Sequence, residues 1–403
     1  MSRAILLVLD SLGVGGAPDA ARFGDAGADT LGHIAEYCAR EAAHGGRGRA
    51  LSIPILASLG LAHAAALSRG APLPGVAMPA PRGAWGCARE RSTGKDSVSG
   101  HWEMAGLPVE FEWGYFRDAE RSFPAELIDA LAQAAGVEGV LGNCHASGTE
   151  IIERLGGAHL RTGWPIVYTS ADSVLQIAAH EQRFGLQRLL DLCRTARGLA
   201  DAWRIGRVIA RPFEGNGPGD FRRTVNRHDY AVPPPSPTLL DAVCAVGGEV
   251  VAVGKVADLF AGRGISRHLA AHGIEALMAT TCRAFAAAAA GTLVFTNLVN
   301  FDQDYGHRRD VGGYATALET LDTLLPSLLG LLREDDLLLI TADHGNDPTW
   351  TGSDHTREQV PILVVGPGIA PRPLGCRDGF ADIGQSLASW LGLPPLPCGR
   401  SFL

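Results

Sequence analysis

The chain has 403 residues, of which 46% are hydrophobic and 19% are charged, ordinary globular values that exclude intrinsic disorder. Its formal net charge of -8 disfavours binding to nucleic acid, because such proteins normally carry a basic excess. No apolar run reaches the roughly 18–20 residues that cross a bilayer, so we expect no membrane association. A chain of this length predicts two domains.

The first predicted element is a buried strand over Ala4–Leu9, directly followed by Asp10. This aspartate ends the apolar run and no small-residue cleavage site comes after it, so the N-terminus does not resemble a signal peptide. The eight cysteines are scattered without a CxxC pair, which indicates reduced thiols. Both observations favour a cytoplasmic protein.

A segment rich in hydroxyl groups follows, with the sequence STGKDSVSGHWE over residues 92–103. A hydroxyl coordinated to a metal ion loses proton affinity and can accept a phosphoryl group at neutral pH. The segment is not a Walker phosphate-binding loop, because Arg89 stands where that motif needs glycine and Asp96 where it needs Ser or Thr. Four hydroxyls lie in this segment, and any of Thr93, Ser97 and Ser99 could be the acceptor.

The pattern changes between about residue 115 and residue 229. Short strands are predicted at Pro165–Tyr168 and Arg207–Ile209 and a helix at Leu186–Arg197, while candidate metal ligands are sparse. A proline-rich joint, Val232–Pro237, comes next. We therefore expect a domain over residues 115–229 inserted between two parts of a core, residues 1–114 and 230–403.

Strand and helix patterns alternate again after the joint. Leucines at helical spacing predict a crossover helix over Tyr314–Leu332. The strands are nearly continuous in apolar residues, which is typical of a mostly parallel sheet buried on both faces. The expected fold class is α/β, with a mostly parallel sheet flanked by helices. The predicted strands are Val250–Val253, Thr292–Val299, Asp336–Thr341 and Pro361–Val365.

Carboxylates and imidazoles follow the predicted strand ends, where a parallel sheet gathers its ligands. Lone residues of these types are usually turn formers or caps, but a set of three Asp and three His suits two metal sites with positions open for phosphate oxygens. The candidate ligands are Asp10, Asp302, His307, Asp343, His344 and His355. The neighbouring Asp304, Asp347 and Asp354 are interpreted as loop caps or as partners of ligands.

Arginines cluster at the end of the inserted segment, and Lys255 ends a predicted strand. Guanidinium groups suit phosphate recognition because they donate two parallel hydrogen bonds. The cluster contains Arg207, Arg211, Arg222, Arg223 and Arg227. For Arg222 a solvated surface position is favoured.

These motifs, in this order, resemble the phosphopentomutase family of the alkaline phosphatase superfamily over nearly the whole chain. The most characteristic segments are YTSADSVLQIAAHE at residues 168–181 and NRHDY at residues 226–230, beside GKDSVSGHWEMAG and LLLITADHGNDPTWTGSDHTRE. The resemblance implies an alkaline-phosphatase-like core with an inserted α/β cap domain. It also implies interconversion of ribose 1-phosphate and ribose 5-phosphate, and of their 2-deoxy forms, with two divalent metal ions, usually Mn²⁺.

The resemblance also assigns roles to individual residues. One ion would be held by Asp10, Asp343 and His344, and the other by Asp302, His307 and His355. The phosphorylated hydroxyl would be Ser97, where the family usually has Thr. In an extended backbone, Ser99 would point the same way but lie roughly 6–7 Å further along. The implied contacts to the sugar phosphate are Asp172, Arg207, the Ile209 backbone, Arg223 and Lys255.

Two other functions are compatible with such a site. A metal-dependent phosphatase of the same superfamily would use water as the acceptor, and a metal- or phosphate-binding protein would need no nucleophile. The candidate sugar contacts favour a mutase, because a retained sugar must be held while the phosphate is handed over. The expected partners are therefore small sugar phosphates, and the sequence indicates no particular oligomeric state.

Overall fold

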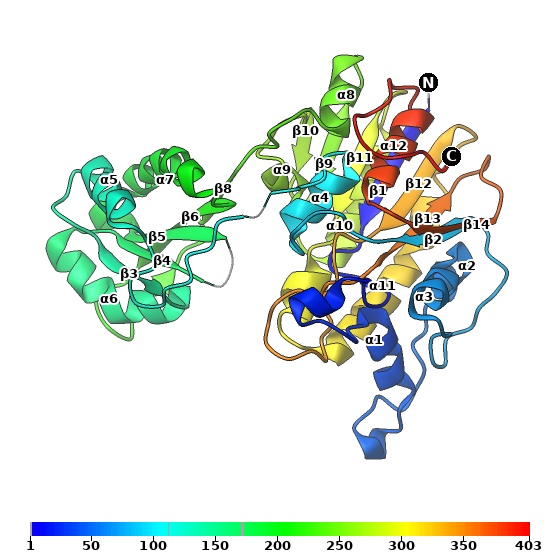
Figure 1. Cartoon of the computed structure of the whole chain (residues 1–403), viewed down its shortest axis with the longest axis horizontal. Coiled ribbons are helices and arrows are strands. Elements are labelled where there is room, and N and C mark those ends of the chain that lie inside the picture. The colour runs from blue at the N-terminus through cyan, green and yellow to red at the C-terminus, as the bar shows by residue number, and fades with distance from the viewer. Residues whose placement is uncertain (1, 112, 171–172) are drawn as a thin grey trace. The chain divides into compact units, whose positions relative to one another are not determined.

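The computed structural model describes residues 2–111, 113–170 and 173–403 (Figure 1). These residues form two compact units, a core unit of Met1–Phe111 with Pro234–Leu403 and an inserted unit of Glu112–Pro233. Each unit contains a sheet with helices, so the chain has the predicted α/β fold. Among the described residues, no helix combines the length and the hydrophobicity that a bilayer-spanning segment needs.

The core unit is built on an eight-stranded sheet in which only β13 runs against the other strands. The strands, in spatial order, are β10 (Arg267–Leu269), β9 (Val250–Val253), β11 (Leu293–Asn297), β1 (Arg3–Val8), β12 (Asp336–Thr341), β13 (Val360–Val365), β2 (Ala84–Ala88) and β14 (Arg372–Arg377). The predicted mostly parallel sheet is therefore confirmed.

The strand β1 lies at the centre of this sheet because all six of its residues are buried and it has parallel neighbours on both sides. Its register places Val8 opposite Asn297 of β11 and opposite Thr341 of β12. The carboxyl ends of the three strands are therefore level. Residues that follow them directly are brought together at one edge of the sheet.

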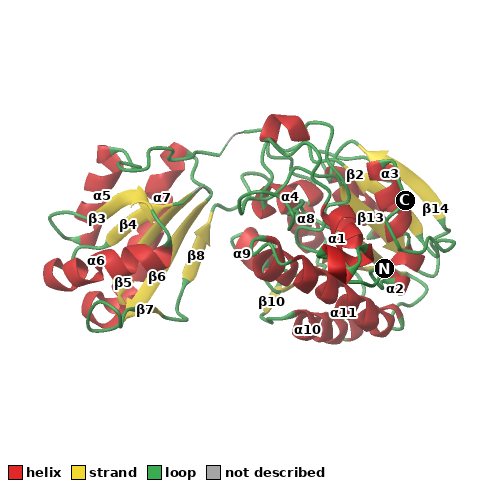
Figure 2. Ribbon diagram, turned by 90° about the horizontal axis from the view of Figure 1, so that it is seen from below, coloured by secondary structure: helices red, strands yellow, loops and turns green. Residues whose placement is uncertain are grey.

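Two groups of helices cover the two faces of the core sheet (Figures 1 and 2). One group contains α1 (Thr30–Ala39), α2 (Pro54–Leu59), α3 (Leu61–Arg69), α10 (Ile274–Ala286) and α11 (Val311–Leu329). The other contains α4 (Ser97–Met104), α8 (Leu239–Ala245), α9 (Val256–Leu259) and α12 (Ala381–Trp390). The predicted crossover helix is α11, which begins and ends three residues earlier than expected and contains Pro326. Short helical turns complete the unit: η1 (Ala20–Phe23), η2 (Ala42–His44) and the π-helix η5 (Phe301–Gly306).

The inserted unit has its own mixed sheet of six strands. Its strands are β3 (Leu141–His145), β4 (Ile166–Thr169), β5 (Val174–His180), β6 (Arg207–Glu214), β7 (Arg222–Arg223) and β8 (His228–Ala231), and β6 continues well past its predicted end at Ile209. The helices α5 (Ala125–Ala135) and α7 (Leu186–Ala200) pack on one face, and α6 (Gly148–Thr162) packs on the other. The turns η3 (Glu181–Gly185) and η4 (Asp201–Trp203) flank α7.

Candidate active site

The candidate metal ligands gather at the edge of the core sheet where the parallel strands end. Asp10 follows β1, the pair Asp343 and His344 follows β12, and Asp302 lies in η5 beyond β11. Because β13 is antiparallel to β12, its beginning lies at the same edge, and His355 is in the loop that leads into it. The antiparallel strand thus completes a ligand set that parallel strands alone would leave open.

Asp10, Asp343 and His344 form a completely buried group, here called the buried cluster. One ligand atom of each residue lies within 4.8 Å of the others. His344 Nε2 is 3.6 Å from Asp10 Oδ1 and 3.4 Å from Asp343 Oδ2. These two oxygens have no hydrogen-bond partner among the described residues, although a buried carboxylate oxygen normally has one. A divalent cation between the three side chains would satisfy both oxygens.

The charges of the buried cluster also fit a bound cation. Burial, followed by the nearby charge of Asp343, raises the pKa of Asp10 well above its ordinary value. Burial acts in the same direction on Asp343, but His344 and His101 outweigh it and lower the pKa of this carboxyl to about 2. Two adjacent buried carboxylates repel each other, and a divalent ion removes that cost.

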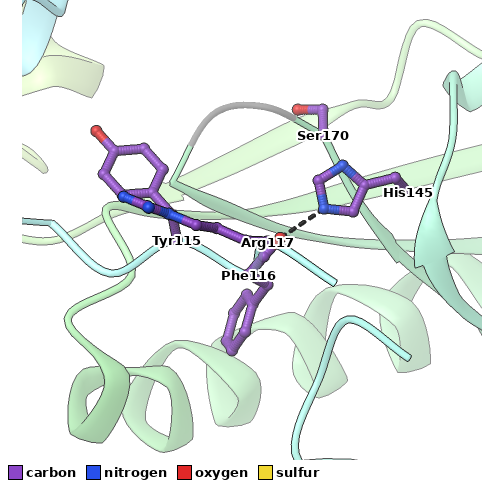
Figure 3. A pocket seen from close by; sticks show the side chains of 5 residues that line it. All are labelled: Tyr115, Phe116, Arg117, His145 and Ser170. Carbon is purple, nitrogen blue, oxygen red and sulfur yellow. Dashed lines mark hydrogen bonds between the residues drawn. The ribbon is translucent and has the colours of Figure 1, made fainter. Parts of the chain in front are cut away.

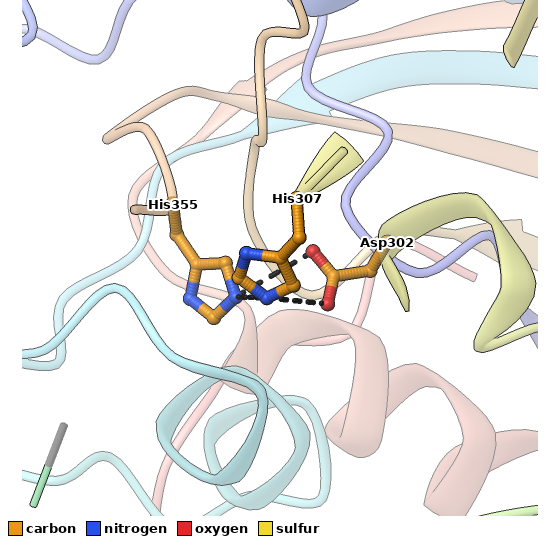
Figure 4. Close-up of side chains that lie close together, drawn as sticks. All are labelled: Asp302, His307 and His355. Carbon is orange, nitrogen blue, oxygen red and sulfur yellow. Dashed lines mark hydrogen bonds and ion pairs between the residues drawn. The ribbon is translucent and has the colours of Figure 1, made fainter. Parts of the chain in front are cut away.

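Asp302, His307 and His355 form the second group, here called the rim cluster (Figure 4). His307 Nε2 lies 3.0 Å from Asp302 Oδ2, and His355 Nε2 lies 3.5 Å from Asp302 Oδ1. Burial would raise the pKa of Asp302, but His355 and His307 lower it well below its ordinary value. The rings of His355 and His344 stack with centroids 3.9 Å apart, so the two clusters are in contact.

All three histidines are oriented in the same way. Each Nδ1 faces a backbone carbonyl, that of Gly345 for His344 at 3.1 Å, of Ser353 for His307 at 2.7 Å and of Lys95 for His355 at 3.0 Å. An Nδ1–H that donates to a carbonyl leaves Nε2 as the lone-pair nitrogen. Each Nε2 points into its cluster, which is the arrangement of metal-binding histidines.

Ser97 is the first residue of α4 and faces the buried cluster. Its Oγ lies 3.2 Å from His344 Nε2. The helix begins here because the side chain of Asp96 accepts hydrogen bonds from the backbone N–H groups of Val98 and Ser99. The positive end of the helix dipole therefore lies at Ser97, where it favours a phosphate group.

The other hydroxyls of this segment have acceptors away from the clusters. Ser92 Oγ donates to Glu103 at 2.6 Å, Thr93 Oγ1 to the Phe111 carbonyl at 2.9 Å, and Ser99 Oγ to Asp96 at 2.8 Å. The expectation of an extended backbone is wrong, because Ser97 and Ser99 both belong to the first turn of a helix. Residues two positions apart in a helix point in different directions, so Ser99 does not share the environment of Ser97.

Sequence reasoning missed several side chains that contact the clusters. His101 Nδ1 lies 3.2 Å from Asp343 Oδ2, and Asn297 Nδ2 donates to Asp10 Oδ2 at 2.9 Å. Asn346 Nδ2 donates to Asp302 Oδ1 at 2.7 Å. The sequence could have identified Asn297 as a candidate site residue, because it is a polar residue near the end of an otherwise apolar run. His101 could have been found from its spacing of four residues from Ser97 only if the helix had been recognised.

The loops that carry Ser97 and His355 are tied together by charged groups. Lys95 Nζ lies 2.9 Å from Asp25 and 3.1 Å from Asp354. The buried Arg357 donates to the Gly94 carbonyl and pairs with Glu90 at 2.7 Å. Asp354 lies outside both clusters, as do Asp304 and Asp347. These contacts fix the segment that carries Ser97 to the rim-cluster loop.

The candidate sugar-phosphate contacts of the inserted unit lie on one face of its sheet. Arg207 and Ile209 are two positions apart on β6, so their side chains lie on the same face, and Arg223 of β7 is paired with Phe213 of that face. Arg207 is 3.7 Å from Asp229, which stands opposite Ile209. Asp172 lies outside the described residues. In the core unit, Lys255 follows β9 at the start of α9.

A cavity of about 350 Å³ lies in the inserted unit (Figure 3). His145, at the end of β3, donates from Nε2 to the Phe116 carbonyl across it. Ser173 ties this region to β6, since its backbone carbonyl accepts from the Arg207 N–H and its side-chain hydroxyl donates to the Gly114 carbonyl. The cavity and Arg207 therefore lie at the same sheet edge. The lining residues are Tyr115, Phe116, Arg117, His145 and Ser170.

Comparison with known proteins adds family information to this geometry. The family model of the metalloenzyme superfamily matches residues 2–395. Phosphopentomutase of Shewanella oneidensis is 57% identical over 100% of both chains, and that of Chromohalobacter salexigens is 58% identical over 100% of this chain and 96% of its own. The solved phosphoglycerate mutase of Leishmania mexicana has a TM-score of 0.48 at 13% identity, covering 99% of this chain and 97% of its own.

Proposed function

Because the chain belongs to the phosphopentomutase family within the metalloenzyme superfamily, we propose that it interconverts ribose 1-phosphate and ribose 5-phosphate, and their 2-deoxy forms. The observation that carries this proposal is the position of Ser97. It combines a helix N-terminus with a hydroxyl 3.2 Å from His344, beside two clusters with the composition of divalent metal sites.

Asp10, Asp343 and His344 would hold one ion, and Asp302, His307 and His355 the other. When bound, two divalent ions would lower the pKa of the Ser97 hydroxyl and neutralise charge on the transferred phosphoryl group. The protein positions Ser97 and orients the histidine ligands. Asp96 starts the helix at Ser97, and the Nδ1 contacts of the histidines keep each Nε2 directed at its cluster. Mn²⁺ is the proposed metal, since mixed carboxylate and imidazole ligands suit it.

The proposed reaction has two phosphoryl transfers. A sugar hydroxyl attacks phosphorus on phosphoserine 97, the P–Oγ bond breaks, and the sugar becomes a bisphosphate. Ser97 Oγ then attacks the other phosphate of the same sugar and leaves the isomeric monophosphate. The helix N-terminus at Ser97 stabilises the phosphate that the serine carries between the two steps.

Recognition of the sugar phosphate is proposed for residues of both units. Arg207, Arg223 and the Ile209 backbone in the inserted unit supply charge and hydrogen-bond donors for a phosphate, and Lys255 supplies a further charge in the core unit. Asp172 is proposed to bind sugar hydroxyls. We propose that the inserted unit, predicted over residues 115–229, is the cap domain of this family and that the enzyme is cytoplasmic.

Product analysis tests this function against its closest alternative. Purified protein with Mn²⁺ is given ribose 1-phosphate, and sugar phosphates and free phosphate are followed by phosphorus NMR. The expected result is ribose 5-phosphate at equilibrium with little free phosphate. Release of one free phosphate per turnover would instead identify a metal-dependent phosphatase. An unchanged substrate with a fully metal-loaded protein would favour a binding protein.

A further inference from the structure

Two cysteines face each other on neighbouring strands at the edge of the core sheet. Cys87 of β2 and Cys376 of β14 are direct partners in the parallel register. Their sulfur atoms lie 3.1 Å apart. Neighbouring strands are about 4.8 Å apart, a separation within the range that a disulfide spans between Cα atoms. The two thiols therefore need no backbone movement to react with each other.

The two thiols have different surroundings. Cys87 is completely buried, whereas Cys376 is exposed. The hydrogen bond from the Cys87 thiol lowers the pKa of Cys376 to about 7, and the nearby charge of Arg89 acts in the same direction. Gln359 Oε1 lies 3.6 Å from Cys87 Sγ and also accepts from Cys376, so one side chain contacts both sulfurs. The exposed Cys376 sulfur is thus partly ionised near neutral pH, and the buried Cys87 sulfur lies directly beside it.

We propose that Cys376 and Cys87 are a redox-active pair that forms a reversible disulfide when the protein meets a peroxide. The Cys376 thiolate attacks one peroxide oxygen, the O–O bond breaks, and a sulfenic acid forms with release of water or an alcohol. The Cys87 sulfur then attacks the Cys376 sulfur. The S–O bond of the Cys376 sulfenic acid breaks, and its hydroxyl leaves as water with the proton of the Cys87 thiol. Two thiols are oxidised by two electrons, and one peroxide is reduced.

The structure gives this chemistry a clear consequence. An exposed thiolate without a nearby thiol is oxidised beyond the sulfenic acid to sulfinic and sulfonic acids, which thiols do not reverse. Cys87 prevents this further oxidation of Cys376, because its thiol is already in contact with the reacting sulfur. The product links β14 to β2, the strand that leads toward the Ser97 segment, and a dithiol reductant restores both thiols.

Peptide mapping of the whole protein tests the pair directly. Protein treated with hydrogen peroxide is alkylated under denaturing conditions, digested and analysed by mass spectrometry. The expected product is a peptide containing Cys87 joined to a peptide containing Cys376, which disappears after treatment with dithiothreitol. Cys282, which is half-buried, serves as the internal control and should remain alkylated. Retention of both thiols, or a disulfide from Cys376 to a different cysteine, would overturn the proposal.

A single substitution sharpens the test. In Cys87→Ser, peroxide should convert Cys376 to the sulfinic acid, because no thiol is in place to trap the sulfenic acid. In Cys376→Ser, Cys87 should remain reduced because it is buried. Equal oxidation of Cys376 to sulfinic acid in the wild type and in Cys87→Ser would show that Cys87 does not act as its partner.

Discussion

The buried cluster and the rim cluster contain the same kinds of ligand but are built differently. The buried cluster of Asp10, Asp343 and His344 follows two adjacent parallel strands and is enclosed by the core. The rim cluster joins the π-helix η5 to a loop before β13, and the side chain of His307 is 39% exposed. The sheet itself fixes the first geometry, whereas hydrogen bonds to backbone carbonyls fix the second.

This difference predicts different responses to the loss of a ligand. Removing a charge from the buried cluster leaves a site that loop movement cannot repair, because its residues directly follow the central strands β1 and β12. Removing a ligand from the rim leaves a site that water can enter and that excess metal can refill. The two clusters should therefore be separable by metal content and by metal rescue.

The largest effect is expected for Asp343→Asn. The substitution keeps the shape of the side chain but removes one of the two negative charges of the buried cluster. Turnover should fall by roughly 10⁴-fold or more, since the charge that balances the ion is lost. Elemental analysis after dialysis should find the rim ion but not the buried ion, and excess Mn²⁺ should restore no activity. The matched control is Asp304→Asn, which lies outside both clusters and should stay within about threefold of wild type.

A smaller effect is expected for His307→Ala. This ligand is exposed, so its loss should lower the affinity of the rim ion while the buried ion stays bound. Turnover should fall roughly 10²-fold at limiting Mn²⁺ and recover in part when Mn²⁺ is in excess. Turnover and metal content measured across a Mn²⁺ titration check this result. Loss of both ions together would show that the two clusters do not bind metal independently.

Lys95→Met should have a still smaller effect. Lys95 joins Asp25 to Asp354 and so holds the Ser97 segment against the rim-cluster loop, but it is not a ligand. Turnover should fall about tenfold because Ser97 is held less well, while both ions remain bound. The matched control is Arg91→Met, since its guanidinium is exposed and pairs only loosely, at 3.4 Å, with Glu110. Unchanged turnover in Lys95→Met would show that this contact does not position Ser97.

The smallest effect concerns a His/Asp pair that belongs to neither cluster. His33 Nδ1 lies 2.6 Å from Asp347 Oδ2, and this hydrogen bond raises the pKa of His33 above its ordinary value of 6.5. Its contribution to stability is therefore full below the unfolded-state pKa and is lost as pH rises through the folded-state pKa. Relative to His33→Gln, the wild type should lose up to about 1 kcal/mol of unfolding free energy between pH 6 and pH 9. Urea unfolding of both proteins at pH 6 and pH 9 measures this difference. The same difference in unfolding free energy between the two proteins at both pH values would contradict the prediction.

The strand ends made the grouping of the candidate ligands predictable from the sequence. Asp10, Asp302 and Asp343 each follow a continuous apolar run, and parallel strands have to end at one edge of their sheet. The predicted strands Val250–Val253 and Asp336–Thr341 coincide with β9 and β12. Both strands are buried on both faces, so each is a continuous apolar run that is easily recognised in the sequence.

Features that depend on contacts distant in the sequence were not predictable. The helix that starts at Ser97 contains Gly100 and His101 and has little amphipathic pattern, because nearly all of it is buried. The strand β2 contains Gly86, and its neighbour at the sheet edge, β14, contains Pro373 and Gly375. Their pairing and the meeting of Cys87 with Cys376 therefore could not be predicted from either segment. Tertiary packing decides such elements more than local propensity does.

In the proposed reaction, Ser97 carries the phosphoryl group between the two transfer steps. Mass mapping of peptides from the active enzyme, taken during turnover of ribose 1-phosphate with Mn²⁺, tests it most directly. We expect phosphate on Ser97, full loss of turnover in Ser97→Ala and retained turnover in Ser97→Thr, which keeps the hydroxyl oxygen. Phosphate on Ser99 or Thr93, or isomerisation that continues in Ser97→Ala, would contradict it.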